Sequence, residues 1–237
     1  MRAWIDILFP PRCAACGGIF AGGSDGGFCP ECLERVRTVH APLCRVCGLP
    51  FETGPPGEGV CEACLRNPPA YTESRALYVY EGPVLEAVHR FKYGGRAHLA
   101  DLFGPLLAEL AAGWLPELED AILMPVPLHP RRLRQRGFNQ SLLLARHLAG
   151  LPGLSLDFLS LQRPRDTIPQ ASLGREERKR NVVRAFALKN PAVVEGRDVL
   201  LVDDVATTGS TLHACGTVLA RAGARRVFCL VLARALA

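Results

Sequence analysis

Two adjacent carboxylates stand at the most informative point of the sequence. Asp203 and Asp204 follow the apolar run 199–202, and small and hydroxyl-bearing residues follow them as far as Thr211. Adjacent carboxylates are costly to bury unless cations or hydroxyl groups meet them at an open edge. A small-residue loop that leads into a helix offers backbone N–H groups and a positive helix end to a phosphate. The pattern therefore predicts a phosphorylated-sugar site, because the alternative of an ordinary strand, turn and helix cap does not explain the acid pair.

The segment 199–211 resembles the phosphoribosyl pyrophosphate (PRPP) motif of the type I phosphoribosyltransferases. The resemblance implies that Asp203 and Asp204 hold the ribose hydroxyl groups, with Mg²⁺ nearby. It also implies a loop that wraps the phosphate, made of Ala206, Thr207, Thr208, Gly209, Ser210 and Thr211. Ala206 is smaller than the branched residue that is common in the family, which we expect to alter packing more than phosphate contact.

A second candidate segment is strongly basic. Residues 128–184 hold twelve Lys and Arg against four Asp and Glu, a net charge of +8, whereas the whole chain carries +5. Clustered cations raise the local concentration of anions, and arginine forks bind the oxygens of a diphosphate in pairs. We therefore expect a polyanion site in this block. A solvated basic surface is the alternative.

Three further segments carry a narrower resemblance, to the ComF (competence protein F) family of amidophosphoribosyltransferase-like proteins. They are Phe91–Arg96, Val126–Gln140, and Pro169–Gln170 with the following Arg175, Arg178, Asn181 and Phe186. The resemblance implies a pyrophosphate loop that contains Leu128, His129, Arg131 and Arg132. It also implies that Arg131 and Arg132 act in catalysis with the acid pair, and that residues 165–184 match the loop that closes over PRPP. For Lys92 the sequence leaves two readings, a side chain that faces the site and an exposed lysine at a helix end.

Two functions fit this resemblance. One is binding of PRPP and Mg²⁺ and transfer of the phosphoribosyl group to an acceptor, in association with DNA uptake. The other is a non-catalytic protein that handles incoming single-stranded DNA through the same basic surface, beside uptake machinery such as a helicase. Aromatic residues are few in or near the basic block, with only Phe138, Phe158 and Phe186, so the sequence shows no base-stacking platform.

Eight of the ten cysteines form four C-x-x-C pairs within the first seventy residues. The pairs are Cys13/Cys16, Cys29/Cys32, Cys44/Cys47 and Cys61/Cys64. Two such pairs supply the four thiolates of a closed, structural zinc site. The repeat predicts a double zinc ribbon with two Zn²⁺ ions, each held by two successive pairs; cross-braced pairing and a disulfide framework are the alternatives.

The rest of the chain predicts the elements that position these groups. Strands are expected at 76–80, 121–126, 199–202 and 227–232, and helices at 83–92, 98–112, 138–148 and 211–222. This alternation predicts an α/β domain with a mainly parallel sheet, the type I phosphoribosyltransferase fold, over residues 71–237 after a zinc ribbon domain over 1–70.

Composition narrows the class of protein further. The chain has 237 residues, of which 49% are hydrophobic and 22% charged, which is typical of globular proteins and excludes a disordered polymer. We see no apolar run long enough to span a membrane and no signal-peptide pattern. We therefore expect a cytoplasmic protein without membrane insertion.

Overall fold

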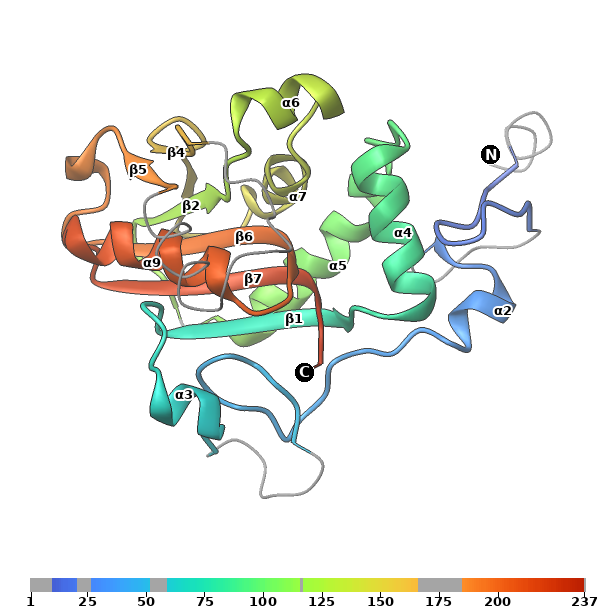
Figure 1. The fold of residues 1–237 in the computed structure, drawn as a ribbon, viewed down its shortest axis with the longest axis horizontal. Helices are drawn as coiled ribbons and strands as arrows, with labels where there is room; N and C mark the ends of the chain where they lie inside the picture. The colour runs from blue at the N-terminus through green and yellow to red at the C-terminus, as the bar shows by residue number, and fades with distance from the viewer. Residues whose placement is uncertain (1–9, 21–26, 52–58, 116, 166–184, 237) are drawn as a thin grey trace.

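A five-stranded parallel sheet forms the centre of the computed structural model, which describes residues 10–20, 27–51, 59–115, 117–165 and 185–236 (Figure 1). The strand order is β1-β7-β6-β2-β3, and every pairing is parallel. The strands are β1 (Glu73–Val79), β2 (Ala121–Pro125), β3 (Leu154–Leu156), β6 (Asp198–Ala206) and β7 (Arg226–Arg234). The predicted α/β class with a parallel sheet is confirmed.

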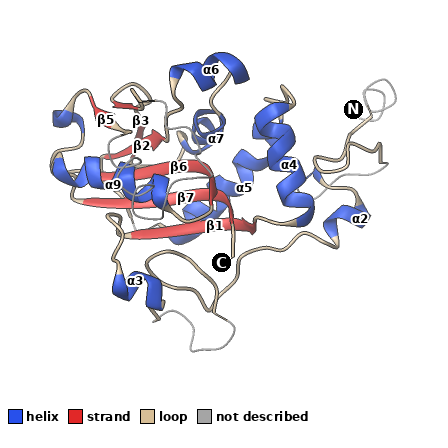
Figure 2. Ribbon diagram, viewed as in Figure 1, coloured by secondary structure: helices blue, strands red, loops and turns tan. Residues whose placement is uncertain are grey.

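Helices cover both faces of the sheet (Figure 2). One face, with Leu123, Leu200 and Leu230, packs against α4 (Gly82–Tyr93), α5 (Leu99–Trp114) and α7 (Gln140–Leu148). The opposite face, with Leu201 and Val231, packs against α9 (Ser210–Arg221). Because both faces are buried, β6 and β7 need no alternation of polar and apolar residues, which explains their continuous apolar runs.

The chain changes direction across the sheet between β2 and β6. From β2 it continues outward to β3, and it then crosses back to place β6 on the other side of β2. Ligands of open α/β sheets bind at the carboxyl ends of the strands at such a switch point. The two strands remain paired there, since the N–H of Val126 donates to the carbonyl of Val202 at 2.9 Å. The loops that follow β2 and β6 therefore start side by side.

Two short strands, β4 (Leu161–Gln162) and β5 (Ala187–Leu188), form an antiparallel pair beside the main sheet. They bracket residues 166–184, so most of the segment predicted to close over PRPP lies outside the described residues. A 3-10 turn, η2 (Pro191–Val193), leads on to β6.

The cysteine-rich segment packs directly on the sheet. It contains the short helices α2 (Pro30–Leu33) and α3 (Glu62–Arg66), and residues 37–46 run along the outer edge of β1. There the N–H of Val79 donates to Arg37 and that of Ser74 to Val46, at 2.8 and 2.7 Å. This segment covers a strand edge that would otherwise expose unpaired backbone groups.

The first predicted zinc ribbon, which contains Cys13, Cys16, Cys29 and Cys32, also shares the core of the sheet domain. The ring of Phe28 lies 6.3 Å from that of Tyr78 in β1 and 6.2 Å from that of Phe103 in α5. Cys13 and Cys32 belong to the same buried cluster as Leu200 and Leu230. The first ribbon therefore folds against the sheet, and its packing fixes it to α4 and α5.

Within the part of the chain that the structure describes, no helix combines the length and the apolar character that a membrane crossing needs.

Candidate functional site

The acid pair lies in the second half of β6. The prediction ended this strand at Val202, and the structure extends it to Ala206 because β7 pairs with it along its whole length. Asp203 and Asp204 are 9% and 6% exposed. The Nζ atom of Lys92, in α4, lies 2.8 Å from Oδ1 of Asp204. Ser141 Oγ, in α7, donates to Oδ1 of Asp203 at 2.9 Å, so a cation and a hydroxyl group meet the pair.

The surroundings of the acid pair shift the pKa of Asp203. Burial and then the neighbouring Asp204 carboxylate raise the pKa of Asp203 to about 7. Lys92, the backbone N–H of Asp204 and the Ser141 hydroxyl act in the opposite direction. One lysine faces two carboxylates, so a ligand that brings hydroxyl groups or a cation stabilises the ionised form.

The predicted phosphate loop connects β6 to α9. Thr207 and Thr208 are exposed, and Gly209 precedes the helix with a φ of 71°. This left-handed conformation favours glycine, because a side chain would be strained there. The hydroxyls of Thr208 and Ser210 lie 2.7 Å apart at the start of α9, whose first turn has no acidic residue. The loop thus presents hydroxyl groups at a helix N-terminus, as a phosphate site requires.

The loop after β2 differs from the prediction. Leu128 and His129 lie in the loop, but Arg131 and Arg132 occupy the first turn of a helix, α6 (Pro130–Arg136). Pro130 favours this start because its φ suits the first helical position. Nδ1 of His129 caps the helix by accepting the N–H of Arg131 at 3.3 Å. Arg132 and Lys92 line one cavity of about 530 Å³, which brings the basic block to the acid pair.

Two polar residues at the start of α7 hold the site together. Asn139 caps α7 by accepting the N–H of Ser141 at 3.0 Å, and its Nδ2 donates to the carbonyl of Val126 at 3.1 Å. Gln140 is buried and donates to the carbonyl of Phe91 at 3.3 Å. Asn139 is therefore the helix cap, and Gln140 joins α7 to α4.

A second cavity, of about 490 Å³, lies between the second ribbon and the phosphate loop. Thr208 and Ser210 line it from the loop, while Cys47 and Cys64 line it from the ribbon. Tyr71, His213 and Arg234 complete much of its wall. Nδ1 of His213 accepts the N–H of Ala70 at 3.1 Å, which ties α9 to the chain that leaves the ribbon. Sequence reasoning missed this contact, because no motif in either segment indicates it.

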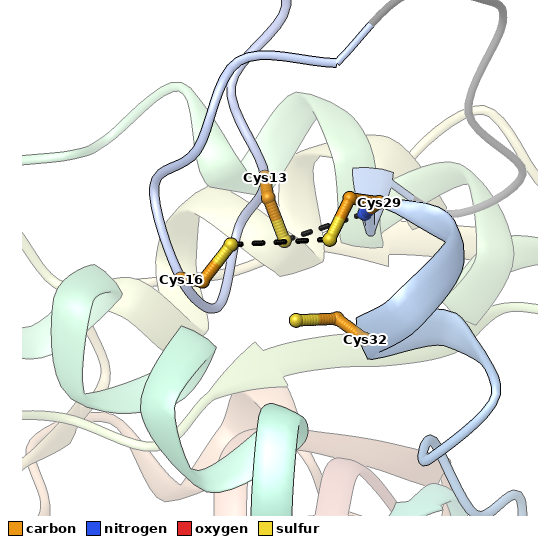
Figure 3. A group of neighbouring side chains, drawn as sticks. All are labelled: Cys13, Cys16, Cys29 and Cys32. Atoms are coloured by element: carbon orange, nitrogen blue, oxygen red, sulfur yellow. Dashed lines mark hydrogen bonds between the residues drawn. The ribbon is translucent and has the colours of Figure 1, made fainter.

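The cysteines of the first ribbon converge from two turns of the chain (Figure 3). The ligand atoms of Cys13, Cys16, Cys29 and Cys32 all lie within 4.8 Å of one another. Cys13 Sγ accepts the N–H of Cys29 at 3.3 Å. Such bonds favour the thiolate, the form that binds zinc.

The second ribbon repeats this arrangement. Cys44, Cys47, Cys61 and Cys64 form a second group within the same limit, and Cys44 Sγ accepts the N–H of Cys61 at 3.3 Å. The four-thiolate geometry fits Zn²⁺, and each group combines two successive pairs, as predicted. Cys215 and Cys229 lie apart from both groups and are fully buried, and burial raises the pKa of each thiol well above its usual value.

Comparison with known families identifies both parts of the chain. Residues 4–65 match the double zinc ribbon domain, and residues 140–237 match the phosphoribosyl transferase domain. With the parallel sheet and its switch point, the second match makes the fold that of the type I phosphoribosyltransferases, and the predicted fold is confirmed.

Several curated proteins are similar over most of their length. The DNA utilization protein YhgH of Salmonella typhi is 39% identical over 215 residues, which cover 87% of this chain and 91% of that protein. Competence protein F of Haemophilus influenzae is 30% identical over 238 residues, which cover 96% of this chain and 99% of that protein. Competence protein ComFC of Bacillus subtilis is 27% identical over 211 residues, which cover 84% and 80%.

Among solved structures, the glutamine PRPP amidotransferase of B. subtilis aligns with 60% of this chain and 30% of its own chain. The identity is 20% and the TM-score is 0.42. A hypoxanthine phosphoribosyltransferase of Staphylococcus aureus aligns with 57% of this chain and 62% of its own, at 16% identity and a TM-score of 0.36.

Proposed function

Because this chain belongs to the ComF family, in which a double zinc ribbon precedes a phosphoribosyltransferase domain, we propose that it binds PRPP and Mg²⁺ at the carboxyl ends of β2 and β6. One observation carries the proposal. A buried acid pair, which contacts Lys92 and accepts a hydrogen bond from the Ser141 hydroxyl, stands directly before a hydroxyl-rich loop at a helix N-terminus. This combination suits a ligand that carries both hydroxyl groups and a phosphate.

Each group has a distinct role in this proposal. Asp203 and Asp204 accept hydrogen bonds from the ribose hydroxyls, and residues 206–211 bind the 5′-phosphate. Lys92 neutralises Asp204 in the free site at 2.8 Å. Arg131 and Arg132, together with the loop residues Leu128 and His129, face the pyrophosphate. Mg²⁺ neutralises pyrophosphate charge when bound, and it prefers substrate oxygens and water to a cage of protein ligands.

The reaction supported by this arrangement is displacement at C1 of the ribose. A nucleophile forms a bond to C1 while the bond from C1 to the pyrophosphate oxygen breaks, and the electron pair leaves with pyrophosphate. The arginines of α6 stabilise the charge that develops on the leaving group. Asp203 and Asp204 hold the ribose in position and move no proton.

A role in DNA uptake is the second proposed function. The relatives named above are a DNA utilization protein and two competence proteins. The observation that favours this role is the shared cavity of Lys92, Arg132 and Arg136, because three cations at one opening suit a phosphate backbone. Cysteines that form zinc sites rather than disulfides fit a reducing compartment, so we place the protein in the cytoplasm.

Isothermal titration of the zinc-loaded protein with PRPP and Mg²⁺ tests the first proposal. We expect saturable binding that Asp204→Asn weakens by about a hundredfold, since the variant loses a charged acceptor. The matched control is Asp120→Asn, an exposed aspartate before β2 that pairs with Arg197 at the other end of the sheet. Unchanged affinity in Asp204→Asn, or an equal loss in Asp120→Asn, contradicts the assignment.

A further inference from the structure

A basic cavity lies between the end of α4 and one side of α6. Its volume is about 530 Å³, and it is lined by Lys92, Tyr93, Gly95, Arg132, Gln135 and Arg136. Three of these six residues are cations and none is acidic. Lys92 connects the cavity to the acid pair through its contact with Asp204. The cavity therefore adjoins the proposed PRPP site, and the three basic side chains that line it make it positively charged.

Tyr93 gives this cavity an aromatic surface. Its side chain is 72% exposed, which is unusual for a large aromatic residue in the folded part of the chain. The guanidinium carbon of Arg136 lies 5.0 Å from the ring centroid, and Nη2 of Arg136 donates to Tyr93 Oη at 3.3 Å. An arginine stacked on one side leaves the ring oriented before any ligand arrives.

The buried side chain of Gln140 holds Arg136 in place beside Tyr93. Nη1 of Arg136 donates to Oε1 of Gln140 at 3.1 Å. Gln140 is 1% exposed, and its Nε2 donates to the carbonyl of Phe91, two residues before Tyr93, at 3.3 Å. These hydrogen bonds join α4, α7 and α6, and they fix the positions of the Tyr93 ring and the Arg136 guanidinium. Both side chains are therefore ordered before a ligand binds.

We propose that this cavity binds a nucleotide unit, with the base stacked on Tyr93 and the phosphate held by Lys92 and Arg132. A phosphate alone makes no use of the ring, and an uncharged aromatic ligand makes no use of the cations. A base joined to a phosphate uses both, because arginine and lysine neutralise the phosphate while every base has a flat face that stacks on an aromatic ring.

The site rests on the proposed DNA role, which it narrows to one nucleotide unit, and it shares Lys92 and Arg132 with the proposed PRPP site. The same chemistry has two sources, a free nucleotide and one nucleotide of a single strand. The alternative is that Tyr93 and Arg136 merely join α4 to α6. That alternative predicts lower stability when Tyr93 is replaced, with no change in ligand binding.

The test measures binding of a short oligothymidylate and of thymidine monophosphate to the zinc-loaded protein, without PRPP, over a range of salt concentrations. We expect Tyr93→Leu to weaken binding by about tenfold with the salt dependence unchanged, because the variant loses the ring on which a base stacks and keeps the cations. Tyr93→Phe should restore most of the affinity. Arg132→Gln should reduce the slope of log affinity against log salt by about one phosphate contact.

Phe158→Leu is the matched control, since Phe158 is 49% exposed and lies outside the cavity. Weaker binding of the oligothymidylate alone by Tyr93→Leu supports the site and identifies a single strand as its ligand. Weaker binding of both ligands supports the site and identifies the nucleotide unit itself as sufficient. Wild-type binding by Tyr93→Leu, an equal loss in Phe158→Leu, or no binding of either ligand overturns it. Tyr93→Leu should still bind PRPP, and Asp204→Asn should still bind the oligomer, so the two proposals fail separately.

Discussion

The two ends of β6 carry the same residue type in opposite surroundings. At the amino end, the fully buried carboxylate of Asp198 accepts four hydrogen bonds, two from Arg225 at 2.9 and 2.7 Å and two from Arg226 at 3.1 and 2.6 Å. At the carboxyl end, Asp203 and Asp204 share one lysine and one hydroxyl group. Among the residues that the structure describes, two arginines pair with one carboxylate at the first end, and one lysine pairs with the two carboxylates at the second.

The pKa values of Asp198 and Asp203 shift in opposite directions. The hydrogen bonds from Arg225 and Arg226 hold the pKa of Asp198 well below its ordinary value, whereas burial raises that of Asp203. The amino end of the strand therefore stabilises the fold. The carboxyl end holds two neighbouring carboxylates whose ionisation burial opposes, as expected of the proposed binding site.

The largest expected effect is at the amino end. Asp198→Asn should lower the free energy of unfolding by about 2 kcal/mol, because a buried group loses its charge-assisted bonds while both arginines stay partly hydrated. The depressed pKa of Asp198 means that its contribution is present above the unfolded value and is lost as pH falls toward the folded one. Urea unfolding at about pH 7 measures it, and a neutral or stabilising result would remove the contrast between the ends.

The same substitution at the carboxyl end should have the opposite sign. The pKa of Asp203 is raised to about 7, so its favourable contribution exists below the unfolded pKa and is lost as pH rises through the folded one. Asp203→Asn should therefore stabilise the free protein by about 1 kcal/mol near pH 8, and by less near pH 6. Thermal unfolding of both variants at the two pH values checks this; destabilisation at pH 8 is the adverse result.

The carboxyl end has a further neighbour in the second ribbon. Because Cys47 and Cys64 share a cavity with Thr208 and Ser210, loss of the second zinc site should disturb the phosphate loop. Cys61→Ser should lose one zinc ion per chain and weaken PRPP binding by about fivefold, or ~1 kcal/mol. Leu65→Ser, an exposed position in α3, is the control and should keep both zinc ions. Full PRPP affinity with one zinc missing would separate the ribbon from the site.

The smallest effect should come from one arginine at the amino end. Arg225 is 55% exposed and shares Asp198 with Arg226, so Arg225→Gln leaves the carboxylate with a partner. We expect a loss of stability clearly smaller than that of Asp198→Asn in the same urea titration. Equal losses would mean that Arg226 contributes nothing to this end of the strand.

The sequence predicted what depends on local pattern. Unbroken apolar runs indicated the buried strands, and cysteine spacing indicated both four-cysteine groups. The acid pair before Gly209 predicted a PRPP site, which stays a prediction. Contacts between distant segments were not predictable. Tyr93 of α4 contacts Arg136 of α6, and Gln140 contacts both helices, so the basic block has an aromatic neighbour from outside its own segment.

Helix α6 and the length of β6 were missed for related reasons. Pro130 and the His129 cap start a helix in a segment rich in arginine that was expected to be a loop. Pairing with β7 extends β6 past the two acids, which a single-strand pattern does not reveal. The packing of Phe28 on Tyr78 and Phe103 likewise depends on tertiary structure.

One measurement compares the two ends most directly: the rise in melting temperature that PRPP and Mg²⁺ produce in the wild type, Asp198→Asn and Asp203→Asn. A ligand that binds only the folded state stabilises it, and the stabilisation rises with the logarithm of the affinity. We predict that PRPP raises the melting temperature of the wild type and of Asp198→Asn by similar amounts, and leaves that of Asp203→Asn almost unchanged. An undiminished rise in Asp203→Asn would contradict the assignment of PRPP to the carboxyl end of β6.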